Sequence, residues 1–342
     1  MREWIRRIGE GEALTIDEAE AAFDEIMRGR ATPIEMAALL VGLKVRGETA
    51  DEVAGGVRAL RRAMVPVPAS PDRLLDTCGT GGGTLTTFNI STAAALVAAA
   101  GGARVAKHGN RSFTSRSGSA DVLESLGVPI ELPPAALSQM LEEVGFAFLY
   151  APRLHPAMRH IAPVRAELGM TTVMNVLGPL ANPASVRRQV VGVAEPHLLP
   201  LVAGAMRRLG HEKALVVHGE PGMDELSPLG LSRAVLVEAG ELVELTFRPE
   251  EFGWSGLEAA GLAGGEPAEN AQRVEGVLRG KLHGAARAAV VLNAAAALYV
   301  TDLAADLSEG VEKSNALIDD GAAWESLQRV RAASRRLLAA DR

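Results

Sequence analysis

Residues 74–84 read Leu74-Leu75-Asp76-Thr77-Cys78-Gly79-Thr80-Gly81-Gly82-Gly83-Thr84. The apolar start predicts a short strand, and residues 91–100 beyond the loop, which are apolar from residue 93, predict a helix. Four glycines among residues 79–83 let the backbone approach a ligand closely and turn its N–H groups toward it. Thr84 at the place of a third glycine excludes a dinucleotide fingerprint, and no Walker A lysine follows. The stretch therefore indicates either an anion-binding loop or an ordinary tight turn between strand and helix.

The same alternation of short apolar strands and helices continues along the chain. Further strands are predicted at 103–106, 146–150, 189–193 and 214–218, and further helices at 120–126, 134–144 and 197–209. A hairpin is expected around residues 238–240, and a helical tail from about residue 288. This order predicts an α/β fold with a central, mostly parallel sheet flanked by helices.

The first 65 residues carry a different pattern, which is that of a helical bundle. Capping boxes are formed by Thr15 with Glu18, Thr32 with Glu35, and Thr49 with Glu52. Three prolines within residues 66–71 then end the helical pattern. We therefore expect a small N-terminal helical domain, residues 1–70, and a larger α/β domain, residues 71–342. A later segment has room to pack into the helical domain as well.

Composition and charge exclude several classes of protein. The 342 residues include 35 Lys and Arg against 42 Asp and Glu, and the net charge of −7 excludes a generally basic nucleic-acid binder. The single cysteine, Cys78, excludes a disulfide framework and a cysteine-based zinc site. No apolar run is long enough for a membrane span, and the N-terminus lacks the apolar core of a signal peptide. We expect a cytoplasmic protein that binds neither nucleic acid nor membranes.

A second polar loop, residues 107–119, follows the strand predicted at 103–106. It carries three cations and five hydroxyls, namely Lys107, Arg111, Arg116, Ser112, Thr114, Ser115, Ser117 and Ser119. Such a set favours a phosphate or diphosphate ligand, although a solvated basic loop is the alternative. Ligands of open α/β sheets bind beyond the carboxyl ends of the strands, where both loops are expected. Together the two loops predict a polyphosphate site.

Two further stretches carry charged candidates. Asp224 and Glu225 follow the strand predicted at 214–218, and adjacent carboxylates there suit Mg2+ that also contacts substrate phosphates. An acidic turn is the alternative. Arg159 and Arg165 are six residues apart, and one of them, if it points into the site, can pair with a substrate carboxylate; a surface charge is the alternative. No Ser-His-Asp set supports a covalent nucleophile, so no catalytic acid, base or nucleophile is predicted.

Together these motifs resemble those of the anthranilate phosphoribosyltransferases. The matching strings are GTGG (79–82), TFNIST (87–92), KHGNRS (107–112), SGS (117–119), PVR (163–165), NVLGPL (175–180), NP (182–183) and GMDE (222–225). The resemblance spans about residues 10–335. It implies a helical and an α/β domain with the site in the cleft between them, and a homodimer formed mainly through the helical domains. It implies Mg2+-dependent transfer of the 5-phosphoribosyl group of phosphoribosyl pyrophosphate to the amine of anthranilate, in tryptophan biosynthesis.

The resemblance also assigns residues to ligands. Phosphoribosyl pyrophosphate would be held by Gly79, Gly82, Gly83, Thr87, Asn89, Ile90, Ser91, Thr92, Lys107, His108, Gly109, Asn110, Arg111, Ser112, Phe113, Thr114, Ser115 and Ser119. Anthranilate would contact Gly79, Asn110 and Arg165, with His108 lining the same channel. Two magnesium ions would be served by Ser91, Asp224 and Glu225.

Three positions depart from the family pattern. Gly83 stands where the family usually has Asp, so a carboxylate is missing and we expect an altered Mg2+ dependence. Thr171 and Met174 stand where the family commonly has Arg and Phe, on the inferred anthranilate side. Two alternatives stay open. One is a phosphoribosyltransferase or nucleoside phosphorylase of the same fold with another acceptor, and the other is a non-catalytic paralogue that binds a ligand or nucleic acid.

Overall fold

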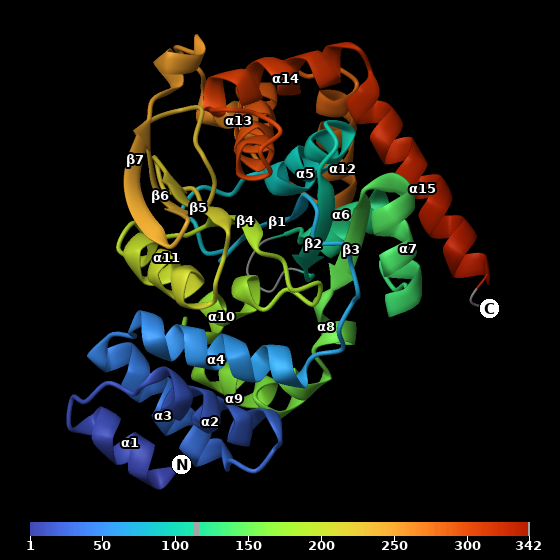
Figure 1. The fold of residues 1–342 in the computed structure, drawn as a ribbon. Coiled ribbons are helices and arrows are strands. Elements are labelled where there is room, and N and C mark those ends of the chain that lie inside the picture. The colour runs from blue at the N-terminus through green and yellow to red at the C-terminus, as the bar shows by residue number, and fades with distance from the viewer. Residues whose placement is uncertain (112–115, 341–342) are drawn as a thin grey trace.

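The N-terminal part of the chain is a bundle of four helices (Figure 1). The structure, a computed structural model, describes residues 1–111 and 116–340. The bundle consists of α1 (Arg2–Gly9), α2 (Ile16–Met27), α3 (Pro33–Arg46) and α4 (Ala50–Ala63). All three predicted capping boxes are confirmed, because each threonine hydroxyl accepts from the backbone N–H of its glutamate and each carboxylate accepts in return. These bonds satisfy donors that the first turn of a helix leaves unpaired.

The larger part of the chain is built on a seven-stranded sheet in the order β3-β2-β1-β4-β5-β6-β7. The strands are β1 (Leu74–Gly79), β2 (Arg104–Gly109), β3 (Phe146–Tyr150), β4 (Arg188–Gly192), β5 (Lys213–Gly219), β6 (Ser232–Glu238) and β7 (Glu241–Phe247). The strands from β3 to β5 in this order are parallel, and β6 and β7 add an antiparallel edge. The predicted hairpin is confirmed, with positive φ at both turn residues, Ala239 and Gly240. The predicted α/β class with a mostly parallel sheet is therefore confirmed.

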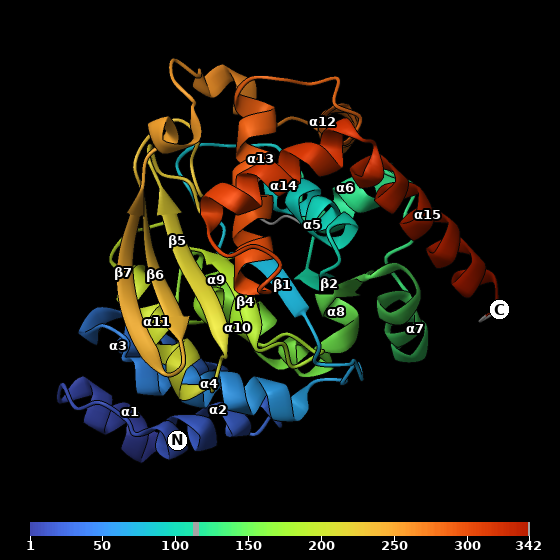
Figure 2. The same cartoon turned by 45° about the horizontal axis from the view of Figure 1, so that its top comes forward.

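Helices cover both faces of this sheet. The helices on one face are α5 (Ile90–Ala100), α6 (Ser119–Ser125), α7 (Pro134–Val144), α12 (Pro267–Leu278), α13 (Ala285–Val300), α14 (Leu307–Asp319) and α15 (Ala322–Ala340). In Figure 2, α13, α14 and α15 lie on the side of the sheet away from the bundle. The other face packs on α11 (Leu198–Arg208), α10 (Met174–Leu180) and the bundle. Side chains alternate between the two cores, as Val190 and Val191 of β4 do.

A segment from the middle of the chain packs into the bundle. It comprises α8 (Ala151–Leu154), the 3-10 helix η1 (Pro156–His160), α9 (Ala162–Leu168) and α10. Ile161, Val164 and Leu177 share one apolar core with α2, α3 and α4. Met174 is 2% exposed in the same core, so its departure from the family pattern is a change in packing, whereas Thr171 is exposed. The domain boundary near residue 70 stays a prediction.

The described helices have no membrane-spanning character. None of them combines the length and the apolar composition that a lipid bilayer requires.

Candidate active site

Four parallel strands end in glycine at one edge of the sheet. These residues are Gly79 of β1, Gly109 of β2, Gly192 of β4 and Gly219 of β5. Gly79 and Gly192 are directly paired in the register of β1 and β4. The loops that follow β1, β2 and β5 therefore gather at this edge, which is where α/β sheets bind ligands. Two glycines of the first loop, Gly81 and Gly82, have φ of 69° and 85°, a conformation that glycine adopts without strain.

Asp224 and Glu225 lie over the ends of β1 and β4. The Asp224 carboxylate accepts a hydrogen bond of 2.9 Å from the Gly81 N–H. The Glu225 carboxylate accepts from the Ser91 N–H at 3.2 Å and from the Thr87 hydroxyl at 3.5 Å. Burial raises the pKa of the Asp224 carboxyl group. Burial, together with the charge of Asp224, raises the pKa of Glu225 well above its ordinary value.

These residues fit a divalent cation. Ionising two neighbouring buried carboxyl groups is costly. A cation between or beside them stabilises their charged forms. The donors are oxygen atoms, from Asp224, Glu225 and the Ser91 hydroxyl, which are the ligands that Mg2+ prefers. Within residues 1–111 and 116–340, no group of three or more His, Cys, Asp or Glu side chains is placed to hold a metal. The set therefore suits a cation whose remaining ligands come from a polyphosphate and water.

Lys107 is buried beside this pair, with 2% of its surface exposed. Its ammonium donates to the Thr77 carbonyl at 2.6 Å and to the Ser91 hydroxyl at 3.3 Å. Burial lowers the pKa of Lys107, while the charges of Asp76 and Glu225 act in the opposite direction. The structure thus brings together Thr87, Ser91, Lys107, Asp224 and Glu225, which the sequence predicted from three separate stretches.

Glycines make room for Asp224. A Cβ atom at Gly79 would lie 2.2 Å from Asp224 Oδ2, and one at Gly192 would lie 1.5 Å from the Asp224 carbonyl oxygen. The sequence analysis predicted Gly79 but missed Gly192, which ends a strand and belongs to no motif. Its one signal is a glycine directly at the carboxyl end of a central strand.

Asn89 is held by residues from distant parts of the chain. Its side chain donates to the Ser117 carbonyl at 3.3 Å and accepts from the amide of Asn270 at 3.0 Å. The neighbouring backbone is paired too, because Phe88 N–H donates to the Leu262 carbonyl at 3.0 Å, at the end of η3 (Ala259–Leu262). The sequence analysis missed Asn270, which is 2% exposed and carries no local motif.

The other residues predicted for phosphate binding lie in the first turn of α5 or in the segment after β2. Ile90 and Thr92 are fully buried in the first turn of α5, and the Thr92 hydroxyl has no hydrogen-bond partner among the described residues. The Ser119 hydroxyl donates to the Asn110 carbonyl at 3.4 Å. The Arg111 guanidinium is engaged by Asp121 and Glu124, at 2.8 and 2.6 Å. The predicted ligands Ser112, Phe113, Thr114 and Ser115 lie outside the described residues.

On the predicted acceptor side, Arg165 of α9 is half-buried. No ion pair or side-chain hydrogen bond joins its guanidinium to any residue that the structure describes, and burial lowers its pKa. The rings of His108 and His155 lie 5.0 Å apart. Burial lowers the pKa of His108 to about 3 and that of His155 to about 4, so both rings are neutral near pH 7. Their Nε2 atoms are buried without a partner among the described residues.

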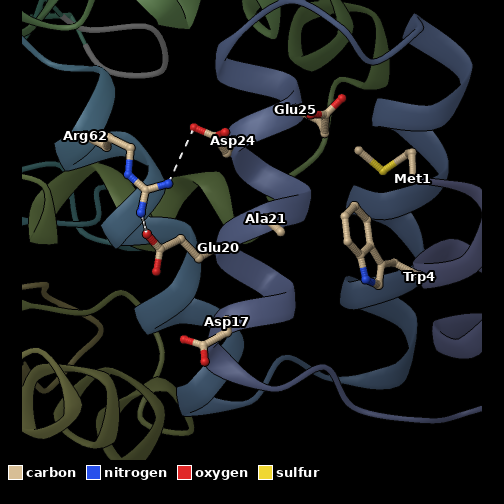
Figure 3. Close-up of a pocket in the computed structure, with 8 residues that line it drawn as sticks. All are labelled: Met1, Trp4, Asp17, Glu20, Ala21, Asp24, Glu25 and Arg62. Atoms are coloured by element: carbon tan, nitrogen blue, oxygen red, sulfur yellow. Dashed lines mark hydrogen bonds and ion pairs between the residues drawn. The ribbon is translucent and has the colours of Figure 1, made fainter.

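A hollow of about 440 Å³ on the bundle is unrelated to this site (Figure 3). It lies against α1, α2 and α4, and its lining residues include Trp4, Asp24 and Arg62. Arg62 forms ion pairs with Glu20 and Asp24, so part of the acidic charge in the hollow is already balanced. None of the residues predicted for the site lines it.

Comparison with known proteins places the chain in a family. Residues 2–64 match the helical bundle domain of the glycosyl transferase family, and residues 71–324 match its a/b domain. The chain is 49% identical over 337 residues to the anthranilate phosphoribosyltransferase of Rubrobacter xylanophilus, covering 98% of each protein. This chain belongs to the anthranilate phosphoribosyltransferase family. The same enzyme from Thermomicrobium roseum is also 49% identical, over 98% of each protein.

Solved structures of this family agree with the fold. The crystal structure of anthranilate phosphoribosyltransferase from Thermus thermophilus has a TM-score of 0.92 and 45% identity, covering 97% of this chain and 99% of that one. The enzyme from Saccharomyces cerevisiae in complex with PRPP and Mg has a TM-score of 0.85 and 29% identity, covering 94% of each chain. A complex of the Saccharomyces cerevisiae enzyme with 4-fluoroanthranilate also has a TM-score of 0.85, at 27% identity.

We predict that Gly192→Ala destabilises the protein and disturbs the site. The added methyl group would meet the backbone of Asp224, and no side-chain rotation can relieve that contact. We expect a loss of about 1–3 kcal/mol in the free energy of unfolding, measured by urea denaturation. Gly9→Ala is the control, because a Cβ atom there meets nothing within 4 Å. Equal stability of the two variants would contradict the prediction.

Proposed function

We propose that this chain transfers the 5-phosphoribosyl group of phosphoribosyl pyrophosphate to the amine of anthranilate. A bond forms between the amine nitrogen and C1 of the ribose, the bond from C1 to the pyrophosphate oxygen breaks, and the amine loses a proton. The observation that carries the proposal is the meeting of Ser91, Asp224 and Glu225 with buried Lys107 beside a glycine-rich loop. Membership of the family supports it, as do the complexes of the yeast relative with PRPP and with 4-fluoroanthranilate.

We propose that the phosphates lie between the glycine-rich loop and the start of α5. The N-terminus of α5 is the positive end of the helix dipole, which favours an anion, and its Ser91 N–H donates to the Glu225 carboxylate. Lys107 adds a buried positive charge at the same edge. The proposed ligands are those predicted from the sequence, in residues 79–92 and 107–119. These groups stabilise the departing pyrophosphate more than the bound substrate, which is electrostatic catalysis.

We propose two Mg2+ ions, held through Ser91, Asp224 and Glu225 together with the pyrophosphate. When bound, Mg2+ offsets the negative charge that grows on the leaving group. The aromatic amine is already a neutral nucleophile, so no side chain is assigned as a general base. The remaining contribution of the protein is to place the amine against C1 of the ribose.

The function is tested by the loss of anthranilate fluorescence in a mixture of protein, phosphoribosyl pyrophosphate and Mg2+. We expect turnover only when all three are present, and parallel mixtures each omit one of them. Turnover with another aromatic amine and none with anthranilate would mean that the acceptor is that amine and not anthranilate. Absence of phosphoribosyl pyrophosphate binding would overturn the proposal as a whole.

For the acceptor, we propose that Arg165 orients the anthranilate carboxylate, with Gly79 and Asn110 beside the ring. A half-buried guanidinium with no anionic partner among the described residues suits such a ligand. The His108 ring, neutral at pH 7, would line the same channel without adding charge.

We predict that Arg165→Ala lowers kcat/KM for anthranilate by about 10- to 150-fold. This corresponds to roughly 1.5–3 kcal/mol, the scale of a hydrogen bond to a charged group. The KM for phosphoribosyl pyrophosphate should stay near that of the unmodified chain. Arg159→Ala is the matched control, since Arg159 is exposed on η1. Anthranilate kinetics that do not change in Arg165→Ala would remove this assignment.

We predict that Gly83→Asp shifts the Mg2+ concentration that gives the highest activity. The new carboxylate would stand near Asp224, because a Cβ atom at residue 83 lies 3.6 Å from Asp224 Oδ1. That Cβ atom also lies 2.8 Å from the Gly222 carbonyl oxygen, so the loop must shift slightly. Gly83→Ala reproduces the crowding without the charge and serves as the control. An identical Mg2+ profile for Asp and Ala at this position would refute a role of the charge.

We propose that the chain forms a homodimer through its helical bundle. Ile34 and Val45 of α3 are 82% and 81% exposed. Eleven residues of an α-helix return to within about 20° of the same direction, so both side chains lie on one face. Two exposed apolar side chains on one face of a helix favour contact with a second copy.

We predict that Ile34→Lys combined with Val45→Lys produces a monomer, because the charges would have to be buried in the interface. Sedimentation velocity measures the change. Val243→Lys on β7 is the control, since Val243 is also an exposed apolar residue, at 46%, but lies outside the bundle. A dimer that persists in the double variant would place the interface elsewhere.

A further inference from the structure

A buried asparagine connects the centre of the molecule to the loop that carries Asp224 and Glu225. Asn293 lies on α13 and is 5% exposed. Its amide oxygen accepts from the Leu226 N–H at 3.0 Å, and its amide nitrogen donates to the Leu226 carbonyl at 2.9 Å. One side chain therefore binds both backbone polar groups of the residue directly after Glu225.

The surroundings of Asn293 make this contact rigid. The helix α13 is rich in alanine and is buried along nearly its whole length. Asn293 donates a further hydrogen bond of 2.9 Å to the Ala289 carbonyl, one turn earlier in the same helix. A buried amide is costly unless it is hydrogen-bonded, so these three bonds determine a single orientation of the side chain.

Asn293 also faces the proposed metal ligands. It lines a cavity of about 10 Å³ together with Thr77, Ser91, Asp224 and Glu225. This space is about that of one water molecule, so the groups around it are closely packed. A shift of the Leu226 backbone would therefore move the Glu225 carboxylate against its neighbours.

Other contacts of this loop come from less central parts of the fold. Ser227 N–H donates to the Ser232 hydroxyl at 2.9 Å, which joins the loop to the start of β6. The Thr84 hydroxyl donates to the Pro221 carbonyl at 3.0 Å, which joins it to the glycine-rich loop. Asn293 differs from these because it comes from a helix in the core.

We propose that Asn293 is a positioning residue, which sets the place of the Glu225 carboxylate for the divalent cation by binding the Leu226 backbone. The inference rests on the proposed function, since it takes Glu225 as a metal ligand. Asn293 itself touches neither the cation nor the substrates. Its loss should weaken metal binding and leave the chemical step intact once metal is saturating.

The experiment measures Mn2+ binding by electron paramagnetic resonance in the presence of phosphoribosyl pyrophosphate. Asn293→Leu keeps the size of the side chain and removes both hydrogen bonds to Leu226. We expect the half-saturating Mn2+ concentration to rise about 10-fold or more, which is typical of losing a residue that orients a metal ligand. The kcat at saturating Mg2+ should stay within about 3-fold, and the KM for anthranilate should not change.

Asn315→Ala is the control, because Asn315 also accepts side-chain hydrogen bonds, from Arg287, but lies on α14 outside the site. If Asn293→Leu does not fold, Asn293→Ser measures the same shift with a smaller change. A lower melting temperature or kcat with an unchanged Mn2+ midpoint would mean a structural role and overturn the inference alone. A wild-type chain that binds no Mn2+ with phosphoribosyl pyrophosphate overturns the proposed function and the inference with it.

Discussion

The close approach of Asp224 to the ends of β1 and β4 is the constraint on which the site depends. No side chain fits at Gly79 or Gly192, because a Cβ atom at either residue would overlap Asp224. The same approach allows the Gly81 N–H to bind the Asp224 carboxylate, which connects the glycine-rich loop to the acidic pair. A parallel sheet is what places these segments together, although more than 140 residues separate Gly79 from Asp224.

The site also depends on the balance of charge among its buried groups. Asp224, Glu225 and Lys107 are all buried at the same edge of the sheet. Burial raises the pKa of the two carboxyl groups and lowers that of the lysine, so it favours the neutral form of each. Lys107 offsets part of the negative charge of the two carboxylates. The backbone N–H groups of Gly81 and Ser91, which donate to these carboxylates, offset a further part. The proposed divalent cation would add positive charge beside the two buried carboxyl groups.

The sequence predicts those parts of the fold and of the candidate site that depend on residues close together in the chain. The capping boxes define where α2, α3 and α4 begin, and the alternation of strands and helices predicts the α/β class. Local patterns cannot reveal a residue whose role depends on a contact with a residue far away in the chain. Gly192 ends an ordinary strand, and Asn270 and Asn293 are single polar residues in helices, so only the fold shows what they contact. The role of Met174 was also hidden, because its burial among bundle residues depends on a segment inserted from the middle of the chain.

That inserted segment separates the proposed acceptor residue from the proposed polyphosphate residues. The separation has a consequence for how the acceptor can change during evolution. Arg165 belongs to a segment whose apolar side chains share one core with the bundle. Lys107 of β2, and the loops that carry Asn89 and the acidic pair, have their apolar neighbours in the other core. Substitutions in the bundle core can therefore change the surroundings of Arg165, the proposed acceptor residue, while the residues proposed to hold the polyphosphate stay in place. Enzymes with the same leaving group and different acceptors could diverge by exchanging this one segment.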